Sequence, residues 1–249
     1  MRILRTMPPV FRRHVLFSVL VAALLVSGVS ALSAFNFAPM VSTIDVSDGS
    51  PYRKTFDVVN DGGDPVAIEI RAYTREIDED GAERTEETDE IDVFPSQLVL
   101  RPGERDTVDA EWAGAPPERE RAFRVIAEQV PVRFEDQTAP ARIRMNLRYV
   151  TSLYVRPDGV EPDLVVRRSE LVFREDEDGS NGPYAEVLLE NTGSAHVLLR
   201  DLQFSPQSDD SEEHGGVLLP RSRRRIFVRL PDRFADEEEG SEVALSVDW

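Results

Sequence analysis

Cysteine is absent from this 249-residue sequence, and Lys54 is the one lysine among 29 basic side chains. Without thiols the chain forms no disulfide and has neither a cysteine nucleophile nor a thiolate metal ligand. Any folded domain must therefore rest on its own hydrophobic core. Basic charge is scarce as well: 47 acidic side chains give a formal net charge of −18, which argues against binding to nucleic acid or anionic lipid through bulk electrostatics.

The acidic surplus has two interpretations. It is either a general adaptation for solubility in salt or a means of recognising a basic partner. The acidic residues are spread over every predicted loop, which favours the first interpretation.

Motifs of catalysis and cofactor binding are also missing. The sequence has no Gly-x-Ser-x-Gly elbow, no phosphate-binding glycine loop and no His-Glu-x-x-His helix. His196 lies in a strand-like run, where a structural role is expected. Residues 176–181 begin like a calcium loop, but Asn181 stands where that loop requires glycine. Hydrolysis by a pair of carboxylates has no motif to support it, so we expect no enzyme, no cofactor and no metal site.

The first 34 residues are predicted to be a signal peptide, cleaved after Ala34. Four arginines and no acidic residue open the segment, the apolar run Val15–Val26 follows, and small residues lead to the end. These are the parts of a secretory signal. The apolar run is shorter than the about 20 residues of a membrane-spanning helix, so we expect no stable membrane insertion after cleavage. Cleavage after Ala31, an uncleaved membrane anchor and export by the twin-arginine route are alternatives.

The rest of the chain has the pattern of short strands. Val66, Ile68 and Ile70 alternate with polar or small residues, and Phe56 and Val58 do the same before a turn at 60–63. Glycines follow aspartates in acidic tips at 80–81 and 178–179, as in tight turns. Repeated strands of this spacing predict an all-β protein built as a β-sandwich.

A domain boundary is predicted at 156–159, where the sequence Arg-Pro-Asp-Gly closes a long alternating segment. We therefore expect a first domain at 35–156 and a second at 157–249, each of about 100 residues, an ordinary domain size. The strands expected in the second domain are 164–166, 171–173, 184–190, 196–204, 226–230 and 243–247.

The segment 141–149 is the most informative part of the sequence. Ile143, Met145, Leu147 and Tyr149 alternate with polar residues, so they share one face of a strand. Taken alone, this pattern is typical of an ordinary sandwich strand with its apolar side in the core.

Several short segments, taken in order, resemble the periplasmic chaperones of chaperone/usher pilus assembly, the PapD-like family. These segments are Thr55–Asp61, Phe94-Pro95, Leu100–Arg105, Glu118–Phe123, Glu128–Pro131 and Leu153–Pro157. The resemblance extends over nearly all of the predicted mature chain, because the turn Asp48–Ser50 and two weaker matches, Glu190–Thr192 and Leu219–Ser222, belong to it as well. Each segment is degenerate, but their order and spacing together are specific. The resemblance implies two immunoglobulin-like β-sandwich domains at an angle, located in the periplasm.

The resemblance also implies a function. Such a chaperone binds a pilus or fimbrial subunit whose own fold lacks a strand, donates that strand, and delivers the subunit to an outer-membrane usher. By this alignment Ile143, Met145, Leu147 and Tyr149 form the donor strand. An uncovered donor strand also pairs with itself in some settings, so a self-capping dimer is a further expectation.

The sequence departs from the family where the subunit's terminal carboxylate is anchored. The family uses an arginine and a lysine, but Ile44 and Ser152 stand at the aligned positions. Arg148, Arg144 and Arg53 are the candidates for a relocated anchor.

An ion-pair set between the domains is better preserved. Glu120 and Arg156 match two of its members, and an acidic residue at Asp236 or Glu237 is expected as the third. The alternative to a chaperone is an exported structural or adhesive β-sandwich protein without client turnover.

Overall fold

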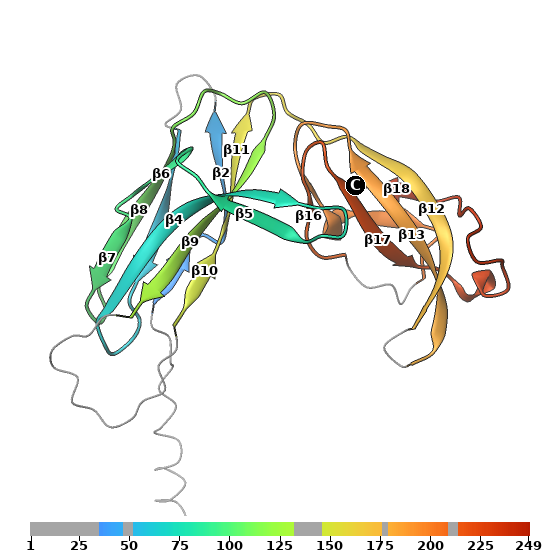
Figure 1. The fold of residues 1–249 in the computed structure, drawn as a ribbon, viewed down its shortest axis with the longest axis horizontal. Coiled ribbons are helices and arrows are strands. Elements are labelled where there is room, and N and C mark those ends of the chain that lie inside the picture. Colours follow the sequence, from blue (N-terminus) through green and yellow to red (C-terminus); the bar gives the residue numbers. More distant parts are fainter. Residues whose placement is uncertain (1–34, 47–51, 132–145, 176–178, 209–213) are drawn as a thin grey trace, which may run out of the picture.

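The computed structural model describes residues 35–46, 52–131, 146–175, 179–208 and 214–249, which form two β-rich bodies (Figure 1). One hydrophobic core gathers buried side chains from Phe35 to Val155, and a second gathers those from Leu164 to Val243. The boundary proposed after Arg156 lies between these cores. The predicted signal peptide lies outside the described residues. In the described ranges no helix is long and apolar enough to cross a membrane.

The first body is a sandwich of two sheets. The four-stranded sheet has the order β1 (Asn36–Ala38), β3 (Arg53–Val59), β8 (Arg105–Trp112) and β6 (Ile91–Phe94). The seven-stranded sheet has the order β2 (Val41–Val46), β11 (Ser152–Pro157), β9 (Arg121–Val130), β4 (Val66–Ile77) and β5 (Glu83–Glu87). In the same sheet β10 (Arg148–Val150) pairs with β9, and β7 (Gln97–Leu100) pairs with β4.

The first stretch of the chain is divided between the two sheets. β1 pairs with β3, and beyond Pro39 the chain continues as β2, which runs parallel to β11 in the opposite sheet. The register of this parallel pair begins with Val41 opposite Ser152. β2 therefore covers the edge of β11 and leaves the residues before Ser152 beyond its reach.

Alternation in the sequence explains which side chains form the core of this body. Ile68 and Ile70 of β4 and Phe56 and Val58 of β3 are all at most 1% exposed, which confirms the predicted inward faces. The rings of Phe37 and Phe56 stack with their centroids 5.0 Å apart. Each such side chain contributes about 1.5–3 kcal/mol of burial free energy, so the core can stabilise the domain without a disulfide.

The second body has a three-stranded sheet of β12 (Leu164–Glu175), β13 (Asn181–Asn191) and β17 (Arg223–Arg229). Two small pairs complete it: β14 (Val197–Leu198) with β16 (Val217–Leu218), and β15 (Gln203–Ser205) with β18 (Ser246–Asp248). The single turns η1 (Leu199–Asp201) and η2 (Asp232–Phe234) are 3-10 helices. The predicted all-β class is confirmed.

Several of the strands predicted in the second body differ from the structure, among them 243–247, of which only the end belongs to β18. The segments 164–166 and 171–173 are parts of one strand, β12, whose register shifts between Val166 and Arg168. The bulge interrupts the alternation and makes one strand look like two. The predicted strand 196–204 is instead β14, η1 and β15 in succession, because the 3-10 turn that contains Arg200 and Asp201 divides its apolar residues between two short strands.

A buried asparagine closes the end of a strand in each body. The amide of Asn60 donates to the carbonyls of Asp64 and Leu100, both at 2.9 Å, and Asn60 is 0% exposed. In the second body the amide of Asn191 donates to the carbonyls of Ala195 and Leu218, at 2.7 and 3.3 Å. The two bodies thus share a structural device although their sequences show no evident repeat.

Replacing Asn191 with alanine is expected to lower the free energy of unfolding by about 2–4 kcal/mol, because two buried carbonyl groups lose their donor. Urea unfolding followed by circular dichroism measures this change. Asn36→Ala, at an exposed position of β1, is the matched control and should shift the midpoint little. Equal midpoints for the two variants would contradict the role assigned to Asn191.

Candidate functional site

β10 is the start of a sheet edge that other strands leave partly uncovered. Its three residues pair with β9, whereas β2 reaches only as far as Ser152. Within the described ranges no strand pairs with the outer side of β10. The edge is visible in Figure 1 at the end of the first body where β9 ends and β10 begins.

The backbone of this edge has its hydrogen-bonding groups turned outward at alternate residues. The carbonyl of Leu147 accepts from β9, and the N–H of Thr151 donates to β9, so the odd-numbered residues bond inward. Because antiparallel bonding alternates along a strand, the backbone groups of Arg148 and Val150 point away from β9. Such unpaired groups are a template for a strand of another chain.

Two residues of the predicted donor strand are described, and both pack against the first body's own core. Tyr149 is partly buried, its hydroxyl donates to the carbonyl of Phe35 at 2.7 Å, and the two rings meet edge to face. Leu147 is also partly buried on that core. Ile143 and Met145 lie outside the described residues. The apolar face is therefore covered at Tyr149 by its own domain.

The three arginines expected as a carboxylate anchor are not brought together. Arg148 extends from β10 and pairs with Glu128 at 3.7 Å, with both side chains more than half exposed. Arg53 lies in the opposite sheet and pairs with Asp109 at 3.6 Å. Arg144 lies outside the described residues.

Two other arginines meet at Ser152, one of the positions where the family's charged anchor is missing. Nη1 of Arg124, on β9, donates to the hydroxyl of Ser152 at 2.7 Å. Nη1 of Arg75, on β4, lies 3.4 Å from the same hydroxyl and donates to that of Tyr154 at 3.2 Å. The second substituted position, Ile44, is 1% exposed in the core. We call Arg75, Arg124 and Ser152 the guanidinium cluster.

The sequence could not reveal this cluster because its members come from three strands. The pairing of Leu153 with Phe123 places Ser152 beside Arg124. On the next strand, β4, Tyr73 pairs with Arg124, two residues before Arg75. The sequence signal is the position of each arginine in an alternating segment, which places Arg75 of β4 and Arg124 of β9 on outward faces. Which arginines face Ser152 depends on strand order.

Both guanidinium groups are largely buried and share one internal carboxylate. The side chains of Arg75 and Arg124 are 9% and 14% exposed. Glu83, the first residue of β5, accepts from Nε of Arg75 at 2.9 Å and from Nε and Nη2 of Arg124 at 2.7 and 2.5 Å. Burial by itself raises the pKa of Glu83, but the two guanidinium groups outweigh burial and lower it. Two cations thus face one anion.

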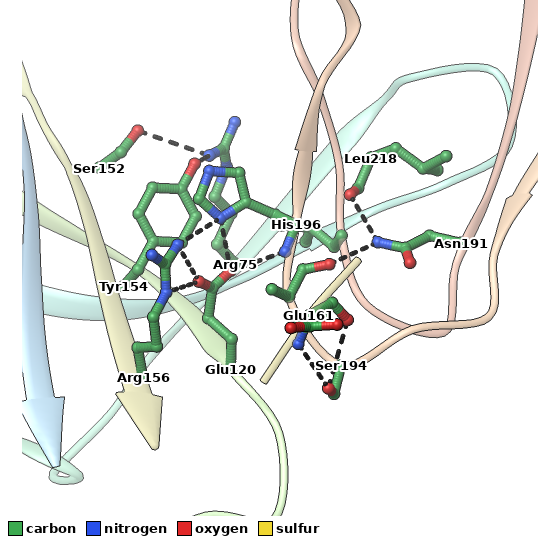
Figure 2. A network of polar contacts seen from close by, with 12 residues as sticks. Arg75, Glu120, Ser152, Tyr154, Arg156, Glu161, Asn191, Ser194, His196 and Leu218 are labelled. Carbon is green, nitrogen blue, oxygen red and sulfur yellow. Dashed lines mark hydrogen bonds and ion pairs between the residues drawn. The ribbon is translucent and has the colours of Figure 1, made fainter. Parts of the chain in front are cut away.

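A second polar network joins the two bodies beside this cluster (Figure 2). Glu120, whose side chain is fully buried, receives Arg156 at 2.6 Å and His196 at 2.5 Å, one on each carboxylate oxygen. The backbone N–H of His196 also donates to Glu120, at 3.1 Å. The His196 ring stacks on that of Tyr154 with centroids 4.1 Å apart. The network therefore connects the guanidinium cluster to the second body through Tyr154.

The third member of this network differs from the sequence expectation. Glu120 and Arg156 meet as expected, but His196 lies beside them. Asp236 and Glu237 follow η2 on an exposed turn, and neither contacts Arg156 in the described part of the chain. His196 directly precedes β14, and its ring and backbone N–H reach the Glu120 carboxylate from the second body.

The β4–β5 hairpin makes another contact between the bodies. It extends from the first body toward β16 and β17 in Figure 1. At its tip, Glu79 and Asp80 accept from Arg225 of β17 at 2.5 and 2.7 Å. The backbone N–H of Arg225 donates to the carbonyl of Glu79 at 2.7 Å. Gly81 supplies the positive φ of 90° that the turn needs, so acidic charge at the tip clamps the hairpin to the second body.

Comparison with known proteins gives the family. Residues 41–161 match the family described as the pili and flagellar-assembly chaperone, PapD N-terminal domain. The chain belongs to the PapD-like periplasmic chaperones. This assignment agrees with the expectation of a non-enzymatic, periplasmic chaperone and sets aside the structural or adhesive alternative. No curated protein sequence matches this chaperone.

Solved structures share the fold of this chaperone at low sequence identity. The class 5 fimbriae chaperone CfaA has 14% identity and a TM-score of 0.56, covering 86% of this chain and 99% of its own. The CsuC–CsuE chaperone–tip adhesion subunit pre-assembly complex of Acinetobacter baumannii has 17% identity and a TM-score of 0.55, covering 79% of this chain and 88% of the matched chain. The Salmonella enterica SafA pilin–SafB chaperone complex has 13% identity and a TM-score of 0.51, covering 88% of this chain and 97% of the matched chain.

The Glu120 network predicts a defined pH dependence. Burial raises the pKa of Glu120, but the hydrogen bonds and charges of His196 and Arg156 outweigh burial and lower it. A carboxyl whose pKa is lowered stabilises the fold above its unfolded-state pKa, near 4.5 here, and that stability is lost as pH falls through the folded-state pKa.

Glu120→Gln should therefore lower the free energy of unfolding at pH 7 by about 1–3 kcal/mol and flatten its decline below pH 4.5. Denaturant unfolding across pH 3–7, about the range in which carboxylates titrate, measures this. Glu128→Gln, in the exposed pair with Arg148, is the control and should change stability little. A Glu120→Gln variant with the wild-type pH profile would refute the assigned linkage.

Proposed function

We propose that this PapD-like chaperone binds pilus or fimbrial subunits along the uncovered edge at β10 and delivers them to an outer-membrane usher. The single observation that carries the proposal is the outer side of Arg148–Val150, which no described strand covers. A subunit that lacks a strand presents the complementary feature, an unpaired edge beside an open groove. Pairing the two edges satisfies the backbone groups of both chains.

The apolar face before Tyr149 is proposed to enter the subunit's groove. Because Tyr149 is used by the chaperone's own core, the groove-filling positions are Ile143 and Met145, with Leu147 at the junction between client and core. Burying three such side chains is worth about 1.5–3 kcal/mol each before the costs of association. Methionine suits this role, since its flexible, polarisable chain fits grooves of different shape.

The guanidinium cluster is proposed to anchor the subunit's terminal carboxylate. Arg75 and Arg124 supply positive charge in partly desolvated surroundings, where hydrogen bonds to a carboxylate are stronger than in water. The hydroxyl of Ser152 accepts from arginine, which leaves its own hydrogen able to donate to a further oxygen. Two neighbouring strands would thus provide the charge that the family's lysine position lacks in this chain. The cluster lies directly beyond β10, so one client strand can pair with β10 and end there.

Delivery to the usher needs no nucleotide in this mechanism. A subunit held by an edge and an anchor can exchange the chaperone's strand for one from the next subunit of the fibre. The interdomain contacts of Glu120 and Arg225 hold the second domain beside the cluster while this happens.

Met145→Glu is expected to abolish recovery of soluble subunit when the chaperone is co-expressed with a candidate pilin. A buried charge in the groove costs several times what the methionine contributes. Val99→Glu is the matched control, because Val99 is 61% exposed on β7 at a different edge. Equal recovery with both variants, each folded by circular dichroism, would count against the donor assignment.

Replacing Arg75 and Arg124 together with glutamine should weaken binding of a pilin-derived peptide by about tenfold or more, since charge-assisted hydrogen bonds are lost. Arg148→Gln should have a smaller effect. Amidating the peptide's C-terminus tests the same contact from the client's side, without altering the chaperone. Isothermal titration calorimetry measures both. A stronger effect of Arg148→Gln, or equal binding of acid and amide peptides, would disprove this anchor.

A further inference from the structure

Glu83 already occupies the guanidinium cluster in the unbound chaperone. Its two carboxylate oxygens accept three hydrogen bonds, all between 2.5 and 2.9 Å, from Arg75 and Arg124. These bonds use the Nε edge of Arg75 and the Nε–Nη2 edge of Arg124. The latter is the two-donor edge that matches a carboxylate best. An incoming carboxylate therefore meets two arginines whose best-placed N–H donors are already hydrogen-bonded to Glu83.

The position of Glu83 allows it to leave without disturbing a core. Glu83 opens β5, all five residues of which are exposed, and β5 pairs with β4 alone. The Glu83 side chain is itself 28% exposed, more than either arginine it binds. A change of its rotamer would break hydrogen bonds but would open no cavity.

The same hairpin carries the clamp to the second domain. Glu83 is the first residue of β5 and lies next to the turn, a few residues after Glu79 and Asp80, which hold Arg225. Between them the hairpin is closed by its own turn, in which the side chain of Asp78 accepts from the N–H of Ala82 at 2.8 Å. The contact at Glu83 and the contact at Arg225 are therefore two polar attachments of one short segment, which Ile77 also joins to the apolar cluster of Tyr154, Val217 and Leu219.

From these contacts we infer that Glu83 is an internal competitor: it holds the guanidinium cluster until a client carboxylate displaces it, and its release loosens the β4–β5 hairpin. The inference rests on the proposed function, because it names the regulation of the same anchor. With Glu83 in this role, only a client that can displace the Glu83 carboxylate binds to the guanidinium cluster. Ligands with a carboxylate but no strand to pair with β10 therefore bind weakly, since they make no other contact to offset the displacement of Glu83.

The alternative role for Glu83 is to hold the two arginines in place for the client. The two roles predict opposite changes in the affinity for a carboxylate ligand when Glu83 is removed. A competitor reduces apparent affinity by the fraction of molecules in which the site is free, so its removal tightens binding. A positioning group preorganises the donors, so its removal weakens binding.

Acetate, with acetamide as the uncharged comparison, is the probe that separates them. We expect Glu83→Gln to bind acetate about fivefold more tightly than the wild-type chaperone, as observed through the Nε–H signals of the arginines in NMR titrations. Glu87→Gln is the matched control: Glu87 lies on the same strand and pairs with Arg71 at 3.3 Å, away from the cluster. It removes the same charge and should leave the acetate affinity unchanged.

Hydrogen exchange supplies the second readout. Amide exchange in β5 and at the tip should quicken in Glu83→Gln and not in Glu87→Gln. Equal or weaker acetate binding by Glu83→Gln would overturn the inference, as would equal tightening by both variants, which would reflect net charge alone. The proposed function fails separately, if pilin peptides bind without regard to their terminal carboxylate.

Discussion

The division of the first strand between two sheets is the constraint on which the rest of this chaperone depends. Because β1 belongs to one sheet and β2 to the other, the sandwich closes, yet β2 pairs with β11 only from Ser152 onward. The outer edge at β10 is left without a partner strand in the described part of the chain. Tyr149 seals the domain's own core beside that edge through Phe35. The same geometry thus makes a stable domain and an unfinished sheet, and a chaperone that lends a strand needs both.

The electrostatics of the molecule concentrate where the edge ends. A protein with a net charge of −18 keeps two largely buried arginines facing one carboxylate beside Ser152. From there Tyr154 leads to His196 and Glu120, so the proposed anchor and the domain interface adjoin. The arginines stand on β9 and β4, whereas the family's lysine position is on the neighbouring strand. A similar local charge can therefore arise from different strands, provided that their side chains share one face of the sheet.

Much of the fold could be predicted, because alternation reports burial directly. The inward faces of β3 and β4 and the all-β class follow from it, and short ordered motifs indicated the family. The site was less accessible. Pairing of Glu120 with Arg156 follows the family's spacing, but His196 is set by the packing of the second domain. Arg75 and Arg124 meet Ser152 only through strand order, which no periodicity encodes. The bulge in β12 likewise interrupts the alternation, so that one strand looks like two in the sequence.

The most direct test of this account is the structure of the chaperone bound to a pilin subunit. The account predicts a subunit strand paired with the outer side of Arg148–Val150, the side chains of Ile143 and Met145 in its groove, and its terminal carboxylate within hydrogen-bonding distance of Arg124. A subunit bound elsewhere, with the β10 edge unpaired, would contradict the central claim.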